Sequence, residues 1–396
     1  MATTNKTQQK LPAKVLKYCT GSWESSDIDL STADDITGLP NKCYLFITQE
    51  TYIALGDVCT TILPSFTAPN LVKSETCGKS NGYFGCQGIY NKNEKLESYS
   101  TWFRCLIKMV VNESYMPVYR PYTWYEMTFF TQWNHLGLCR VLCVNTPNQL
   151  QLGLSTNLQN IPYQIQHNDP FALHTSLFSQ ITVLYDESIW KIRNLVRKFE
   201  KERLSATPNF EDMHEVSRHA IHTTEVLSVT LNTLERFRGH QKLVYELQGT
   251  ELGLNFRMQA QENTSFLLEL LKAFKLRSES IHARLQNEIT LSYNSLARQD
   301  NIVVKAIAIL TTLFLPATFF AAFFSTTFFT FGEKEWGVSN KLWIYWGTTV
   351  PSTILVAGIC VLWVYRPIRN PFTSSLWKGF SRGSVDVQQV HPYHVA

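Results

Sequence analysis

Residues 303–324 read VVKAIAILTTLFLPATFFAAFF, and residues 342–364 read LWIYWGTTVPSTILVAGICVLWV. Each run exceeds the roughly 20 apolar residues that a helix needs to cross the hydrocarbon core of a bilayer. Lys305, at the start of the first run, is the only charged residue in either. We therefore expect residues 303–365 to form a two-helix transmembrane domain, in preference to buried helices of a soluble protein.

Basic residues flank the predicted spans on one side of the membrane. The connecting segment 325–341 carries Glu333 and Glu335 against Lys334 and Lys341, so these charges cancel. Because basic residues concentrate in cytosolic segments, we expect both termini in the cytosol and the short loop outside. The flanking basic residues are Lys275, Arg277, Arg284, Arg298 and Lys305 before the spans, and Arg366, Arg369, Lys378 and Arg382 in the basic tail 366–396.

The composition and the N-terminus argue against nucleic-acid binding, secretion and a mitochondrial location. The net charge is only +4, and no long basic run is present, so nucleic acid is not an expected partner. The N-terminus lacks the apolar core of a secretory signal, so the nine cysteines are expected to be reduced. It also lacks an Arg-rich amphipathic pattern, which favours the plasma membrane over the mitochondrial inner membrane.

The polar N-terminal part is predicted to contain a folded domain. Residues 1–40 are expected to be a flexible lead-in, and residues 41–168 a cytosolic α/β domain. Glycines between residues 78 and 91 indicate a loop. They form no phosphate-binding fingerprint, and no nucleophile elbow or carboxylate pair is found, so we expect no enzyme activity and no catalytic residue. Aromatic and β-branched residues favour strands at 43–48, 102–110, 124–132 and 139–144.

Residues 169–302 are predicted to form long helices that end in a stalk. Asn168-Asp169-Pro170 is typical of a helix start, and apolar residues recur at helical spacing to about residue 203. A second helix is expected over about 211–247. A third begins near residue 252 and contains neither Pro nor Gly from 254 to 315. It is expected to continue as a coiled-coil stalk directly into the first span.

Two histidines of the second helix allow alternative interpretations. Glu215, His219 and His222 are spaced by four and three residues, so they can share one helical face and bind zinc. The alternative is a polar helix face that makes packing and ion-pair contacts. The sequence favours the second interpretation, because the spacing does not match that of a zinc metalloprotease helix.

The stretch FLPATFFAAFFSTTF, residues 314–328, carries a family resemblance. It resembles the first membrane helix of CorA-like magnesium and divalent-cation transporters, where a Phe-Leu-Pro-x-Thr-Phe run leads to Gly-Met-Asn. Residues 174–203, 214–234 and 277–294 are similar to the fungal branch of that family. The matching residues are Phe314, Leu315, Pro316, Thr318, Phe319 and Phe328. The resemblance implies an α+β membrane protein that forms a homopentamer in the lipid bilayer, with Mg²⁺ as the transported and regulatory ion and no covalent cofactor.

One face of the first span has the composition of a pore. Its residues recur in steps of three or four and mix small, hydroxyl-bearing and apolar side chains, whereas close helix packing is the alternative explanation. Val304 and Leu315 are expected to form hydrophobic constrictions, and Asn301 with Asp300 the cytosolic mouth. The predicted pore-lining residues are Asn301, Val304, Ala308, Thr311, Leu315, Thr318, Ala322 and Thr326.

The predicted entrance departs from the family pattern. Ser325, Thr326 and Thr327 stand where the family carries Gly-Met-Asn, followed by the acidic Glu333 and Glu335 of the outer loop. We expect a passive channel for divalent cations, with magnesium as the main ion. The alternative is a non-conducting regulatory or interaction paralogue, which binds a related paralogue instead of copies of itself. Tentative regulatory metal ligands on the stalk are Glu279, Glu288 and Asp300; ordinary solvated or salt-bridged charges are the alternative.

Overall fold

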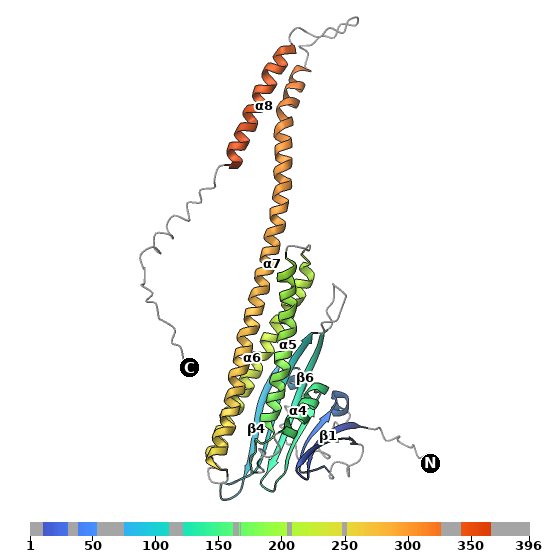
Figure 1. The fold of residues 1–396 in the computed structure, drawn as a ribbon, viewed down its shortest axis with the longest axis vertical. Coiled ribbons are helices and arrows are strands. Elements are labelled where there is room, and N and C mark those ends of the chain that lie inside the picture. Colours follow the sequence, from blue (N-terminus) through green and yellow to red (C-terminus); the bar gives the residue numbers. More distant parts are fainter. Residues whose placement is uncertain are drawn as a thin grey trace, which may run out of the picture. The chain divides into compact units, whose positions relative to one another are not determined.

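The computed structural model describes residues 11–30, 39–53, 75–110, 122–160, 166, 168–203, 208–247, 252–325 and 342–365 (Figure 1). The chain divides into two compact units, residues 1–293 and 294–396. The predicted α/β domain and the cytosolic part of the long helices therefore form one unit, because both share a single hydrophobic core.

A seven-stranded sheet forms the centre of the first unit, with the strand order β2-β1-β3-β7-β6-β5-β4. The pair β3 and β7 is parallel, and all other neighbouring pairs are antiparallel. The predicted strands at 43–48, 102–110, 124–132 and 139–144 are confirmed. The strands are β1 Pro12–Cys19, β2 Ser22–Asp29, β3 Lys42–Ile47, β4 Gly82–Tyr90, β5 Leu96–Val110, β6 Tyr122–Asn134 and β7 Cys139–Val144.

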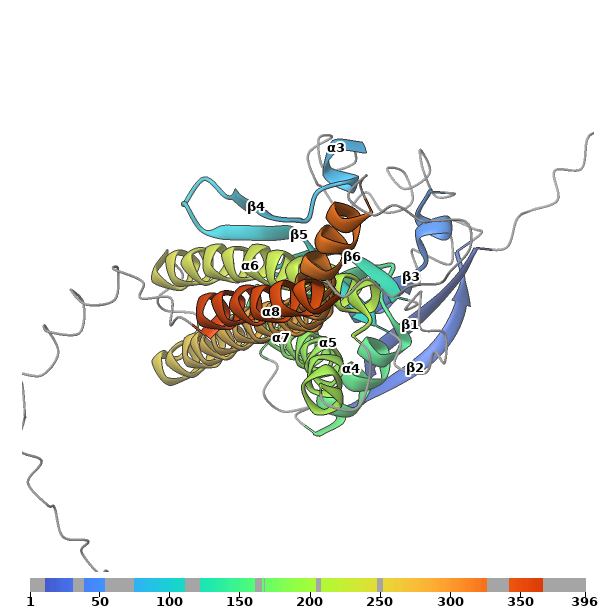
Figure 2. The same cartoon turned by 90° about the horizontal axis from the view of Figure 1, so that it is seen from above.

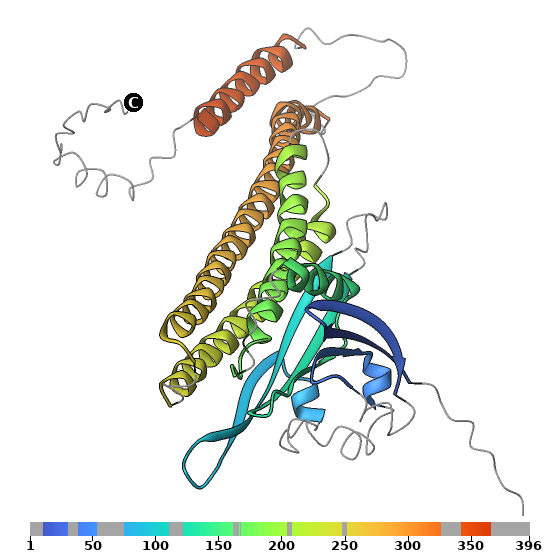
Figure 3. The ribbon, with the colours of Figure 1, turned by 60° about the horizontal axis from the view of Figure 1, so that its bottom comes forward.

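Helices α4 Asn148–Asn160, α5 His174–Glu202 and α6 Phe210–Leu247 cover one face of the sheet (Figures 2 and 3). Side chains alternate between the two faces of each strand, so Leu16 faces the helices while Val15 faces the opposite side. The helix-side core joins Phe103 and Phe129 of the sheet to buried residues of α5, α6 and the start of α7. A smaller cluster, which includes Trp102 and Phe130, fills the other face.

Two sequence predictions for this unit are wrong. The lead-in 1–40 contains β1 and β2, which pair along their full length from Pro12↔Asp29 to Cys19↔Ser22. The expected glycine loop contains β4. A Cβ at Gly85 would lie 2.2 Å from the Trp102 indole nitrogen, and a Cβ at Gly82 would lie 2.7 Å from Val229. These glycines therefore allow close packing within a strand rather than a turn.

The long helices are close to their predicted bounds. The Asn168-Asp169-Pro170 segment precedes α5 by a turn, and the Asp169 carboxylate accepts a hydrogen bond from the Phe171 amide over 2.9 Å. Helix α7, Leu254–Phe324, is continuous from the stalk into the first apolar run, as predicted. The second apolar run forms α8, Leu342–Tyr365. A short helix, α3 Glu75–Gly78, precedes β4.

Candidate functional site

The C-terminal part of α7 is the strongest candidate for a functional site. Within Leu254–Phe323 lies a stretch that is apolar and long enough to cross a membrane, and only 6% of that stretch is buried within the chain. In α8, Trp346–Ile359 forms a shorter apolar segment. Both apolar runs are therefore helical, as predicted. The first run is a candidate membrane span. We still predict that the second run also crosses the membrane.

Threonine hydroxyls along this part of α7 are oriented by the helix itself. Thr311 Oγ1 lies 3.1 Å from the Ile307 carbonyl oxygen and 3.0 Å from that of Ala308. Thr318 Oγ1 lies 3.0 Å from the carbonyl oxygens of Phe314 and Leu315. Each hydroxyl thus donates its proton to the backbone, and both lone pairs of its oxygen remain available as acceptors. Such oxygens can accept hydrogen bonds from the water shell of a cation.

The predicted pore residues from Asn301 to Ala322 lie on this one continuous helix, so their spacing places them on one face. Val304 is 61% exposed and Leu315 67% exposed. Exposure does not separate this face from the others, because Ile309 on the opposite side is also 68% exposed. The pore assignment therefore stays a prediction that depends on the side-chain chemistry.

The predicted entrance is described only in part. Ser325 follows the end of α7, and its Oγ donates a hydrogen bond to the Ala322 carbonyl oxygen over 2.9 Å. Thr326, Thr327, Glu333 and Glu335 lie outside the described residues. Ser325 thus repeats the arrangement of Thr311 and Thr318, with its proton bound by the helix backbone.

The tentative regulatory carboxylates have different surroundings. Glu288 is buried and accepts hydrogen bonds from two nitrogens of Arg203, one of them at 2.9 Å, so the pair joins the end of α5 to α7. Oε1 of Glu279 lies 3.9 Å from Nζ of Lys275 on the same helix. The Asp300 side chain is exposed. In the described part of the chain, no group of three or more His, Cys, Asp or Glu side chains is arranged to hold a metal ion.

The histidine face of α6 has two separate sets of contacts. The Glu215 carboxylate lies 3.3 Å from Nε2 of His219 and also pairs with Arg218. His222 Nδ1 instead lies 3.0 Å from Nζ of Lys108. The same Nζ lies over the Tyr122 ring in a cation–π contact. Burial, and to a lesser extent Arg218, lowers the pKa of Lys108 to about 8. These contacts fit the polar packing interpretation better than a zinc site.

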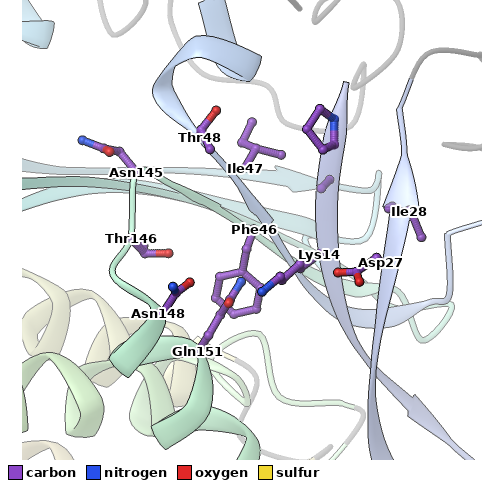
Figure 4. Close-up of a pocket in the computed structure, with 12 residues that line it drawn as sticks. Lys14, Asp27, Ile28, Phe46, Ile47, Thr48, Asn145, Thr146, Asn148 and Gln151 are labelled. Carbon is purple, nitrogen blue, oxygen red and sulfur yellow. The ribbon is translucent and has the colours of Figure 1, made fainter. Parts of the chain in front are cut away.

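A cavity of about 280 Å³ opens between β1, β2, β3 and the start of α4 (Figure 4). Lys14 and Asp27, which are cross-strand partners, lie beside the Phe46 ring and Gln151. No sequence signal indicated this cavity, because the part of its lining that lies on β1 and β2 comes from the segment that was expected to be a lead-in. It lies in the first unit and shares no residue with the apolar part of α7.

Comparison with known proteins places the chain in a family. The sequence model for the CorA-like Mg²⁺ transporter protein family matches residues 145–366. The notoamide biosynthesis cluster protein M' of Aspergillus versicolor is 27% identical over 264 residues, which are 59% of this chain and 58% of that protein. This chain thus matches little more than half the length of that relative.

Solved structures share the fold. The full-length CmaX protein has a TM-score of 0.57 at 13% identity, over 89% of this chain and 98% of its own. The CorA magnesium transporter from Methanocaldococcus jannaschii has a TM-score of 0.50 at 12% identity, over 88% and 96%. With the family model matching more than half of the sequence, the protein belongs to the CorA-like Mg²⁺ transporter family.

Proposed function

We propose that the protein passes divalent metal cations, chiefly Mg²⁺, across a membrane down their electrochemical gradient. The observation that carries the proposal is the row of hydroxyls along α7 and at the residue that follows its end. Thr311, Thr318 and Ser325 each give their proton to the helix backbone and present an acceptor oxygen outward. Mg²⁺ dehydrates reluctantly, so acceptors for its bound water suit this ion. Family membership supports the same function.

One α7 helix cannot enclose a pathway, so several copies must contribute theirs. We propose a homopentamer in the bilayer, with five α7 helices around the axis and α8 outside as a second span. Both termini are then cytosolic, and the plasma membrane is the favoured location. No nucleotide is needed as an energy source, because a divalent cation that moves inward gains about 4.6 kcal/mol per 100 mV. Cytosolic Mg²⁺ is the proposed regulatory ion.

A second candidate function follows from the entrance. Ser325, Thr326 and Thr327 replace the Gly-Met-Asn of the resembled family, and hydroxyl groups are shorter than an asparagine amide. A chain that kept the fold but lost conduction would act as a regulatory or interaction subunit, bound to a related paralogue. This candidate predicts stable membrane insertion without metal flux.

Flux through the purified full chain in liposomes separates the two candidates. We expect Mg²⁺ to enter faster than in protein-free liposomes, with Ni²⁺ and Co²⁺ also passing and Na⁺ excluded. Growth rescue of magnesium-transport-deficient cells is the matching cellular measurement. Absence of divalent flux from correctly inserted protein, together with capture of a membrane partner, would support the non-conducting candidate instead.

A further inference from the structure

Cys86 differs from most other thiols of the described residues in its surroundings. Cys43, Cys105, Cys139 and Cys143 are buried, and burial raises the pKa of each thiol, to about 12 for Cys43 and Cys105. Reaction requires the thiolate, so these four thiols are protected. Cys86 is only half-buried and lies on β4, one of the two edge strands of the sheet.

The packing of β4 on α6 brings a histidine to this thiol. Phe84 and Cys86 share one face of β4, while Phe237 and His240 are three residues apart on α6. Phe84 packs edge-on against Phe237 at 6.0 Å between centroids and also contacts the His240 ring at 5.7 Å. In this arrangement Cys86 Sγ lies 3.3 Å from Nδ1 of His240.

The imidazole is suited to accept the thiol proton. Burial, and then the nearby Arg236, lowers the pKa of His240 below its usual value. The ring is therefore neutral at pH 7, and Nδ1 accepts a hydrogen bond from the thiol when Nε2 carries the proton. A thiol beside a neutral base is the arrangement that generates a nucleophilic sulfur.

A buried hydroxyl, that of Tyr99, also interacts with this thiol. Tyr99 is 3% exposed, and its hydroxyl makes no hydrogen bond of ordinary geometry with any residue that the structure describes. Tyr99 pairs with Gly88, so it lies diagonally across from Cys86 on the neighbouring strand. Burial, and then the Cys86 thiol, raises the pKa of Tyr99. An oxygen atom added to the sulfur would give this donor an acceptor.

We propose that Cys86 is a peroxide-sensitive thiol, activated by His240 and oriented so that Tyr99 stabilises the oxidised form. The sulfur attacks one oxygen of hydrogen peroxide, so an S–O bond forms as the O–O bond breaks. His240 takes the thiol proton and passes it to the leaving hydroxide. Cys86 becomes a sulfenic acid, and the peroxide is reduced to water. This site is independent of whether the chain conducts ions.

The test measures sulfenic acid at two cysteines of the same molecule. The purified full chain is treated with low hydrogen peroxide at pH 7 and trapped with dimedone, and adducts at Cys86 and the half-buried Cys19 are quantified by mass spectrometry. We expect Cys86 to react at least about tenfold faster, because general bases typically contribute about 10²-fold or more. Equal rates at the two cysteines would overturn the proposal.

Two variants assign the roles. His240→Phe keeps a ring against Phe84 but removes the base, so the Cys86 rate should fall to that of Cys19. Tyr99→Phe should leave the initial rate within about twofold but shorten the lifetime of the sulfenic acid. An unchanged Cys86-to-Cys19 ratio in His240→Phe would reject activation by the imidazole. If that variant does not fold, the wild-type ratio alone decides the proposal.

Discussion

At the scale of single residues, Asp169 is a buried titratable group of the first unit. Its carboxylate is buried, accepts a hydrogen bond from the Phe171 amide and lies 3.1 Å from the Tyr245 hydroxyl that donates to it. Burial nevertheless raises the pKa of Asp169 from 3.8 to about 7. In the unfolded chain this group ionises near pH 4, so between about pH 4 and pH 7 only the folded state holds the proton.

Asp169 therefore makes the protein less stable as the pH rises through this window. Asp169→Asn cannot ionise, so its melting temperature should rise relative to wild type between pH 5 and pH 8. The expected gain at pH 8 is on the order of a few kcal/mol, at about 1.4 kcal/mol per pKa unit. Asp27→Asn, at an exposed site, serves as the control. A difference from wild type that stays constant from pH 5 to pH 8 would argue against this account.

Buried His174 is held by two hydroxyls. Thr101 Oγ1 lies 2.8 Å from His174 Nε2 and 2.6 Å from Thr131 Oγ1, while Thr131 Oγ1 lies 3.2 Å from the same nitrogen. Burial lowers the pKa of His174 to about 3, so the ring stays neutral. This cluster anchors α5 to the centre of the sheet.

Removal of the Thr101 hydroxyl, which makes the two shortest contacts of this cluster, should be the most damaging change. Thr101→Val is expected to lower the free energy of unfolding by about 1–3 kcal/mol, because it leaves buried polar atoms unpaired. Thr131→Val should have a smaller effect, and Thr156→Val on the exposed side of α4 almost none. Chemical denaturation measures the three free energies of unfolding. Equal losses for the first two variants would show that the shorter contact of Thr101 with His174 adds no stability.

At the scale of elements, sequence patterns predicted the long helices and most of the sheet. They did not predict the strands at the two edges of the sheet. β5, β6 and β7 are rich in aromatic and β-branched residues, so their composition revealed them. β4 was missed because its glycines resemble a turn, whereas Gly82 and Gly85 are needed for contact with neighbouring side chains. β2 was missed because it is largely polar and half of its residues are exposed, as an edge strand can be. β1 was missed with it, as part of the expected lead-in.

A pair of glycine substitutions tests this explanation. Gly85→Ala would place a Cβ within 2.2 Å of the buried Trp102 indole, so we expect a loss of about 1–3 kcal/mol. Gly239→Ala lies within α6, where a Cβ would meet nothing within 4 Å, so a gain of up to about 1 kcal/mol is expected. Thermal denaturation of the two variants should give shifts of opposite sign; destabilisation by both would contradict the packing argument.

At the scale of the whole molecule, the sequence predicted a continuous stalk and first apolar helix because no Pro or Gly interrupts residues 254–315. The threonine spacing indicated one face of that helix, and the structure adds that the hydroxyl protons are bound by the backbone. A single chain cannot reveal which face lines a pathway, because the burial that would distinguish it depends on neighbouring copies. The Glu288–Arg203 pair was likewise hidden, since its residues are 85 positions apart.

In the proposed channel, the Thr318 face of α7 lines the cation pathway. The most direct measurement is Mg²⁺ influx into liposomes that contain wild type, Thr318→Phe or Ala306→Phe, each at the same protein density. Ala306 lies about 120° around the helix from Thr318, at 100° per residue, and away from the proposed face. We predict that Thr318→Phe abolishes influx while Ala306→Phe retains it. Wild-type influx that persists in Thr318→Phe, or is lost equally in both variants, would contradict the claim.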